Sequence, residues 1–508
     1  MIRILLLCLF CSALNAQNIT FEDLSFQNDF EKQQILKFKE NSNYLAVLIA
    51  SSGRGNNEIL KKAEEKMDEV YLSLKPEKLQ NKSPKKKIKK IFKGVQNDLL
   101  VRYNLENEFI EVFENGRYNC VSSTAIHALL LERFKINYII TQEPEHVYLT
   151  ATFPALNIVM EGTDPQGGYV PITEKLIEAQ INSLVNRKLI TVEELNSPDA
   201  DKILDELFPS NEIDLAELIG VQYENKMAYS YDSENYKAAY ENALKALYFY
   251  DCERFRTGLY FSAYSYMEVL GFDDENYAKV LGKIEKMDSS KAHLDEVMRL
   301  SDLAMATLQQ ENKSYELNQL YRQLKRELKD SSTLKNVEMF HSLIQSELFN
   351  KLGRLDSAYY YGRKAMRLDS SNIYAPGLLI SALFKKCAIN GFESIADTLE
   401  KYYLKYEVIR KNDVYVSQLI RSALAQALDE ISQKNYSECQ YFIDKFERLS
   451  TKHSNLKVEP KLLSDAYTRL ALFEYNRSKR KALKTLNRGL VFAPGNKDLL
   501  NMKTLMSN

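Results

Sequence analysis

Three residues whose side chains could act together on an acyl group follow one another along the chain: Cys120, His146 and Asp164. A thiol attacks a carbonyl carbon only as the thiolate, and a helix N-terminus or a neighbouring imidazolium lowers its pKa. A carboxylate bonded to the imidazole fixes its tautomer and orients the ring. The three residue types, in this order, predict nucleophilic acyl transfer through a Cys–His–Asp triad.

The elements expected around these residues would bring them together. Residues 119–134 predict a helix that begins at Cys120, and three stretches rich in β-branched and aromatic residues predict strands. These strands cover residues 137–141, 147–152 and 157–160. A short turn at Pro154 would pair the last two as a hairpin, with His146 at the start of one strand and Asp164 past the end of the other.

Two alternatives remain open at this stage. Glu161 lies three residues before Asp164 and could supply the carboxylate instead. His127, two helical turns after Cys120, allows a zinc site made of Cys120, His127 and His146. Because the spacing matches no standard zinc motif, we predict neither a metal nor a cofactor.

These residues also resemble a known family. Gly116-x-x-x-Cys120 opening a helix, His146 beginning a strand and Asp164-Pro165 closing the next strand are similar to the transglutaminase-like core of the papain-like superfamily, over about residues 95–170. The resemblance implies that Cys120 is the nucleophile, His146 the general base and Asp164 the orienting carboxylate. It implies acyl transfer from glutamine side chains or hydrolysis of amide bonds, although some members have lost activity. Tyr148 stands where the family often has Trp.

The beginning of the chain predicts a signal peptide, and the part after residue 210 predicts a helical region. Arg3, the apolar run 4–13 and Leu14-Asn15-Ala16 resemble a signal peptide with cleavage after residue 16. No later segment is apolar enough to cross a membrane, so we expect an exported protein, periplasmic or secreted, without a transmembrane segment in the mature chain. From residue 211 to residue 508 we expect helices only.

Within this second part, three stretches repeat one pattern of large and small residues. They begin near Tyr223, Leu343 and Tyr467, and each places small residues where paired helices would approach closely. The pattern resembles tetratricopeptide repeats, which stack into a solenoid whose concave face binds proteins. The expected fold class is therefore an α+β transglutaminase-like domain over residues 17–210, followed by an all-α tetratricopeptide-like solenoid over residues 211–508. The alternative function is a catalytically inactive core that acts with the repeats as a protein-interaction scaffold.

Composition limits the partners. The chain of 508 residues is 45% hydrophobic and 27% charged, with a net charge of −1, so no nucleic-acid partner is expected. One exception to this balance is a helix predicted to begin at Ser83-Pro84, whose lysines alternate with an apolar face. These lysines could contact an acidic surface or lipid headgroups, or form an ordinary solvated helix face.

Overall fold

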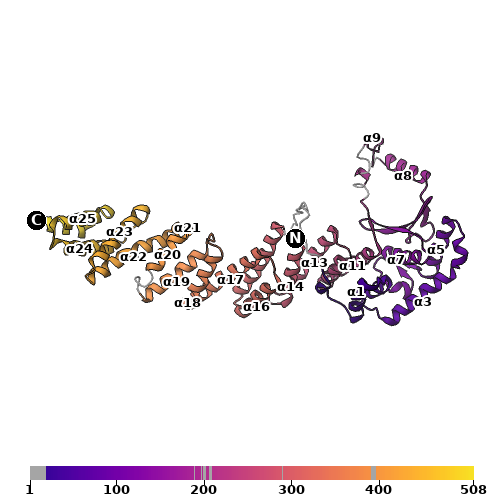
Figure 1. Cartoon of the computed structure of the whole chain (residues 1–508), viewed down its shortest axis with the longest axis horizontal. Coiled ribbons are helices and arrows are strands. Elements are labelled where there is room, and N and C mark those ends of the chain that lie inside the picture. Colours follow the sequence, from indigo (N-terminus) through magenta and orange to yellow (C-terminus); the bar gives the residue numbers. More distant parts are fainter. Residues whose placement is uncertain are drawn as a thin grey trace. The chain divides into compact units, whose positions relative to one another are not determined.

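The computed structural model describes residues 19–187, 189–195, 197, 202–204, 209–288, 290–390 and 396–507. Figure 1 shows helices throughout the chain and a single larger sheet in the first part. The expected signal peptide, residues 1–16, lies outside the described residues. The chain divides into two compact units after His293. The sequence-based boundary at 210/211 therefore falls inside the first unit.

Helices dominate the described part of the chain. Those before the sheet are η1 (Phe21–Asp23), α1 (Asp29–Asn41), α2 (Tyr44–Ser51), α3 (Asn57–Ser73), α4 (Pro76–Gln80), α5 (Pro84–Asp98) and α6 (Glu111–Glu114). The predicted start at Ser83-Pro84 is confirmed, with Ser83 at the N-cap and Pro84 as the first helical residue. None of the described helices is both long enough and apolar enough to cross a bilayer.

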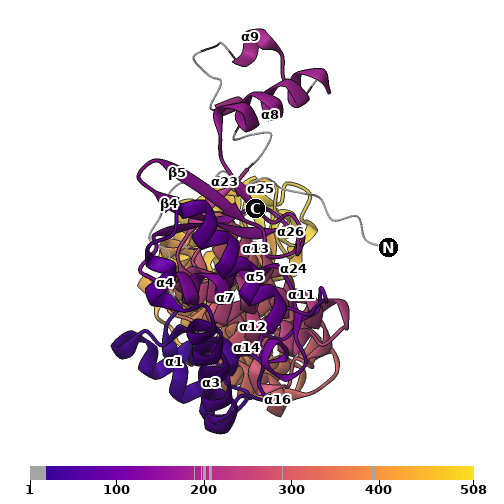
Figure 2. The ribbon, with the colours of Figure 1, turned by 90° about the vertical axis from the view of Figure 1, so that its right-hand side faces the viewer.

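The sheet is antiparallel, in the strand order β6–β5–β4–β3–β7. Its strands are β3 (Tyr138–Gln142), β4 (Val147–Phe153), β5 (Leu156–Met160), β6 (Tyr169–Pro171) and β7 (Asn211–Ile213). The three predicted strands correspond to β3, β4 and β5, and the predicted hairpin of β4 and β5 is confirmed (Figure 2). Strand β7 follows residue 210, where only helices were expected. It is three residues long and forms by pairing with β3, which no local pattern reveals.

Two helices pack on the sheet. Helix α7 (Cys120–Arg133) packs on β4, and α5 packs against α7, β5 and β6. Two short parallel strands, β1 (Arg102–Tyr103) and β2 (Arg117–Tyr118), lead the chain into α7. The remaining helices of this region are α8 (Glu174–Asn186) and α9 (Val192–Leu195).

The first unit also contains helices that follow residue 210. They are α11 (Leu215–Asp232), α12 (Tyr236–Phe249), α13 (Glu253–Val269) and α14 (Glu275–Met287). Helix α11 packs on both α2 and α7. Glu31 of α1 accepts hydrogen bonds from Lys245 Nζ at 2.8 Å and Tyr223 Oη at 2.9 Å, and all three side chains are buried. This buried cluster ties the beginning of the chain to α11 and α12.

The second unit is helical throughout its described residues. Its helices are α15 (Lys291–Gln310, which starts just before the division), α16 (Ser314–Glu327), α17 (Ser331–Lys351), α18 (Leu355–Leu368), α19 (Ala375–Asn390), α20 (Ala396–Lys405), α21 (Glu407–Arg410), α22 (Asp413–Ser432), α23 (Tyr436–Lys452), α24 (Pro460–Tyr475), α25 (Lys479–Phe492) and α26 (Lys497–Ser507). Successive helices pack in pairs, α17 with α18, α22 with α23, and α24 with α25.

Four of the turns between successive helices share one geometry. Glu234, Asn312, Gly353 and Lys434 are all left-handed, with φ between 60° and 70°. In each turn the next residue donates its backbone N–H to a carbonyl five positions earlier, at 2.8–2.9 Å, as in a Schellman motif. Their positions differ by multiples of about forty residues, so the backbone repeats more regularly than the sequence does.

These turns predict opposite effects for two substitutions in the second unit. Lys434→Gly should raise the free energy of unfolding by up to about 1 kcal/mol, because glycine adopts a positive φ without the steric penalty of a Cβ. Gly353→Ala should lower it by about 1 kcal/mol through the backbone alone, since a Cβ there would meet no atom within 4 Å. Urea denaturation measures both. Equal stability of Lys434→Gly and the parent protein would contradict the argument.

Candidate active site

Cys120 is the first residue of helix α7. Asn119 caps this helix by accepting the backbone N–H of Ser122 at 3.0 Å, and Ser122 Oγ accepts the Asn119 N–H at 2.9 Å. This reciprocal capping box fixes the helix start. The thiol is thereby held at the positive end of the helix, as the sequence predicted. It is almost buried, with 9% of the residue exposed.

His146 immediately precedes β4, and the carboxylate that contacts it belongs to Glu161. The distance from His146 Nε2 to Glu161 Oε2 is 2.6 Å. The other carboxylate oxygen accepts the backbone N–H of Thr163 at 2.9 Å and its hydroxyl at 2.5 Å. Both oxygens of Glu161 are therefore engaged, and the ring nitrogen of His146 left for Cys120 is Nδ1.

Asp164, the carboxylate of the predicted triad, has a different role in the structure. Its Oδ1 accepts the backbone N–H groups of Gln166 and Gly167 at 3.1 and 3.0 Å, which closes its own turn. The reason lies in the strand register. Leu149 pairs with Met160, so Glu161 lies opposite Tyr148 and diagonal to His146 on one face of the hairpin, whereas the chain turns before it reaches Asp164.

A glycine allows α7 to approach this turn. A Cβ on Gly162 would lie 2.6 Å from both Cβ and Oγ of Ser123, so no other residue fits without displacing α7. The Gly162 carbonyl accepts Gln96 Nε2 of α5 at 2.7 Å. On the His146 side, Thr124 Oγ1 of α7 donates to the carbonyl of Val147 at 3.2 Å. These contacts join the helix that carries Cys120 to the hairpin that carries His146 and Glu161.

The charges of the site stabilise an imidazolium. Hydrogen bonds with the Cys120 side chain and with Glu161 raise the pKa of His146 from 6.5 to about 10, although partial burial opposes the shift. Burial alone would raise the pKa of Glu161, but the hydrogen bonds from His146 and Thr163 outweigh it and the net pKa is lowered. The raised pKa of His146 means that its contribution to stability is complete below about pH 6.5 and is lost as the pH rises through about 10. The contribution of Glu161 is instead lost as the pH falls.

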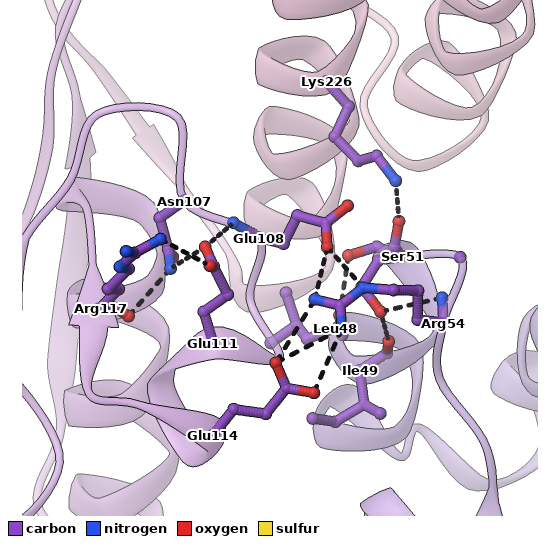
Figure 3. A network of polar contacts seen from close by, with 12 residues as sticks. Leu48, Ile49, Ser51, Arg54, Asn107, Glu108, Glu111, Glu114, Arg117 and Lys226 are labelled. Carbon is purple, nitrogen blue, oxygen red and sulfur yellow. Dashed lines mark hydrogen bonds and ion pairs between the residues drawn. The ribbon is translucent and has the colours of Figure 1, made fainter.

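A polar network supports the segment that leads into Cys120 (Figure 3). Arg54 donates to Glu108 at 2.9 Å and to Glu114 at 3.3 Å, and Asn107 Nδ2 donates to the Arg117 carbonyl at 2.9 Å. Lys226 of α11 donates to the carbonyl of Ser51. The network therefore links α2, α6 and α11 around the approach to the nucleophile.

Two further residues from beyond position 210 hold the segments on either side of the site. Tyr229 Oη of α11 donates at 2.5 Å to the carbonyl of Leu105, which also accepts Asn119 Nδ2 at 3.2 Å. Arg254 of α13 donates at 2.6 Å to the carbonyl of Pro144, in the loop before His146. Sequence reasoning missed both residues, because each lies about 110 positions or more from its partner, in a helix with no chemical motif.

These elements surround a small pocket of about 50 Å³. Cys120 and His146 line it together with loop 142–145, with Val221, Glu224 and Asn225 of α11, and with Arg254 of α13. Arg254 also donates to Glu224 Oε2 at 3.3 Å. The pocket is therefore closed on one side by helices that the sequence assigned to a separate domain.

The structure gives no support to the zinc alternative. Nδ1 of His127 contacts the Ser123 carbonyl at 2.7 Å, and its ring stacks on Phe92 with 5.3 Å between ring centroids. Burial lowers the pKa of His127 to about 4, so it is a neutral core residue. Among the residues described, no three His, Cys, Asp or Glu side chains cluster in a way that could hold a metal ion.

The other cysteines have different surroundings. Burial raises the pKa of the Cys252 thiol, and it raises that of Cys439 to about 11. Cys387 belongs to α19, but its side chain lies outside the described residues. Of the described cysteines, only Cys120 has an imidazole partner.

Neither a protein-family model nor a curated protein matches this chain, so the proposals below rest on its own residues and geometry.

Proposed function

We propose that this protein is an exported, transglutaminase-like enzyme that transfers acyl groups, or hydrolyses amide bonds, through Cys120, His146 and Glu161. The observation that carries the proposal is the 2.6 Å contact of Glu161 with a histidine whose pKa is raised by the Cys120 side chain. A thiol, an imidazole and a carboxylate in series constitute the machinery of thiol-dependent acyl transfer.

The chemistry follows from these positions. The Cys120 thiolate attacks the carbonyl carbon of an amide, and the backbone N–H of Cys120, free at the start of α7, donates to the developing oxyanion. The His146 imidazolium protonates the departing amine, which leaves a thioester on Cys120 and a neutral imidazole. Water or a second amine then loses a proton to His146 and attacks the thioester, which releases the acyl product and restores the Cys120 thiolate beside the His146 imidazolium. Glu161 stabilises the imidazolium throughout.

The remaining helices fit a supporting role in the same proposal. The evenly spaced Schellman turns favour repeated helical pairs with a period of about forty residues, longer than that of a standard tetratricopeptide repeat, and such repeats would bind a protein partner or a protein substrate. In this proposal the first helices after residue 210 also position the site, through Tyr229 and Arg254.

Alkylation of the thiols tests the catalytic proposal. At about pH 6.5, iodoacetamide should modify Cys120 at least about tenfold faster than Cys252 or Cys439, because an imidazolium partner favours the reactive thiolate. His146→Ala should remove this advantage, whereas His453→Ala, in the second unit, should leave it unchanged. Peptide mapping of the alkylated protein gives the rate at each cysteine. Equal rates at the three sites, or no effect of His146→Ala, would refute a competent thiol.

A second candidate is the inactive interaction scaffold, and one observation favours it. The pocket of about 50 Å³ has room for only a few water molecules, and Cys120 is only 9% exposed. A larger substrate would fit only if residues that line the pocket, such as those of the loop before His146, moved. For an inactive scaffold we expect slow alkylation of Cys120 in the folded protein and no acyl-enzyme with an activated ester, with partner binding unaffected by Cys120→Ala.

A further inference from the structure

A hollow on the first unit lies between α3, α4 and α5, away from the residues of the candidate site. Its volume is about 610 Å³. Seven of the ten residues that line it are lysines: Lys75, Lys78, Lys82, Lys86, Lys89, Lys90 and Lys93. The others are Ser73, Leu74 and Leu79, so no carboxylate lines it. We call this feature the lysine groove.

The arrangement of these lysines is unfavourable for the helix that carries most of them. In α5, Lys86, Lys89, Lys90 and Lys93 follow at helical spacings of three and four, where like charges repel. The first turn also contains lysines and no acidic residue, opposite to the preference of the helix dipole. Elsewhere in the unit an exposed lysine such as Lys62 has a carboxylate partner, Glu58, at 2.7 Å.

Within the described residues, none of the groove lysines forms an ion pair with a carboxylate. Lys89 Nζ lies 5.9 Å from the centre of the Tyr169 ring, a contact that offsets only a small part of the repulsion among these lysines. An anion from outside would relieve it and would bind the more strongly for that reason. Local rules of helix stability are broken most often where a protein binds something, which points to a ligand at this surface.

The residues that line the groove disfavour nucleic acids, phosphate groups and membranes as its ligand. It presents no aromatic side chain on which a nucleobase could stack, as single-stranded nucleic acids require. It contains no arginine fork for bidentate phosphate recognition. It is concave, with Leu74 and the buried Leu79 among its lining residues, whereas a membrane-binding helix presents exposed apolar residues on a convex face.

We propose that the lysine groove binds an acidic segment of a partner polypeptide, in which Glu or Asp side chains flank an apolar residue. Ammonium groups from three successive segments of the chain pair singly with successive carboxylates, and the partly exposed Leu74 accepts the apolar side chain. The opposite face of α5 packs against α7, β5 and β6, so the groove belongs to the same unit as Cys120. The proposal does not depend on whether Cys120 reacts.

The test measures binding of a fluorescent Glu-rich peptide of about ten residues with a central Leu to the full-length protein by fluorescence anisotropy, at low salt and at about 0.3 M salt. Lys86→Gln/Lys90→Gln removes two groove charges. Lys85→Gln/Lys87→Gln is the matched control, because it removes two charges from the same helix at positions that do not line the groove. We expect the groove variant to weaken binding on the order of tenfold and the control less than about twofold, with added salt weakening both.

Three results would overturn the proposal. One is an equal loss of affinity in the groove variant and the control. Another is tighter binding of anionic lipid vesicles, of polyphosphate or of a single-stranded oligonucleotide than of the peptide. The last is equal binding of the peptide in which Gln replaces every Glu. Misfolding is not an alternative explanation, because removing repulsive charges should leave the melting temperature of the groove variant unchanged or raised.

Discussion

Glu161→Gln should lower the rate of acyl transfer by about 10²–10⁴-fold, whereas Asp164→Asn should leave it within about twofold of the parent protein. The first change keeps the shape of the side chain but removes the charge that holds His146 as imidazolium at 2.6 Å. The second change keeps an oxygen that can accept the backbone N–H groups of Gln166 and Gly167. Both rates can be measured with an activated ester such as p-nitrophenyl acetate.

The pH profile adds a readout that a merely structural role would not change. Loss of the carboxylate should lower the pKa of His146 from its raised value, so the alkaline limb of the rate profile should move to lower pH in Glu161→Gln. Asp164→Asn should leave that limb in place. A large loss of activity in Asp164→Asn with little change in Glu161→Gln would restore the triad inferred from the sequence and contradict the geometry.

Lys245→Met should destabilise the first unit by about 3–5 kcal/mol, because it leaves the carboxylate of Glu31 buried without its charged partner. Lys245 and Glu31 are 1% and 0% exposed at their side chains, so water cannot replace the lost contact. Thermal unfolding followed by circular dichroism should show the first unit melting at lower temperature, with the second unit little affected.

Two controls separate charge from packing in this result. Glu31→Gln/Lys245→Met removes both charges, while the side-chain amide introduced at position 31 can still accept the hydroxyl of Tyr223, so it should recover more than half of the lost stability. Lys62→Met, at an exposed ion pair, should change stability by no more than about 0.5 kcal/mol. Equal effects of Lys245→Met and Lys62→Met would show that the buried pair contributes nothing special.

The sequence predicted the local features of the fold and of the site well, for a physical reason. The starts of α5 and α7 follow from residues adjacent in the chain, Ser83-Pro84 and Asn119, and β4 and β5 follow from short runs rich in β-branched and aromatic residues. The side chain that contacts His146 depends on register. The sequence offers Glu161 only as an alternative to Asp164, because a hairpin can be inferred from a turn while the pair of residues that meet across it cannot.

Long-range contacts were beyond the reach of sequence reasoning. Tyr229 donates to the carbonyl of Leu105, and Arg254 donates to the carbonyl of Pro144. Because any residue can supply a backbone carbonyl, the identity of the accepting residue does not reveal its partner. The boundary at residue 210 rests on the sequence Phe208-Pro209-Ser210-Asn211, after which no strand pattern is found. The structure instead groups residues by contact, and α11 to α14 pack with the first unit.

The buried cluster around Glu31 can form only after Lys245 has been synthesised. Its partner Lys245 is 214 positions later in the chain, so at a synthesis rate of roughly 5–20 residues per second the pair cannot form until roughly 10–40 s after Glu31 is made. Helix α2, whose residues from Leu45 to Ser51 are all buried in the finished unit, lacks its α11 neighbour during the same interval. During this interval a chaperone that binds apolar segments can bind α2 of the nascent chain. The interval ends when α11 and α12 pack in place.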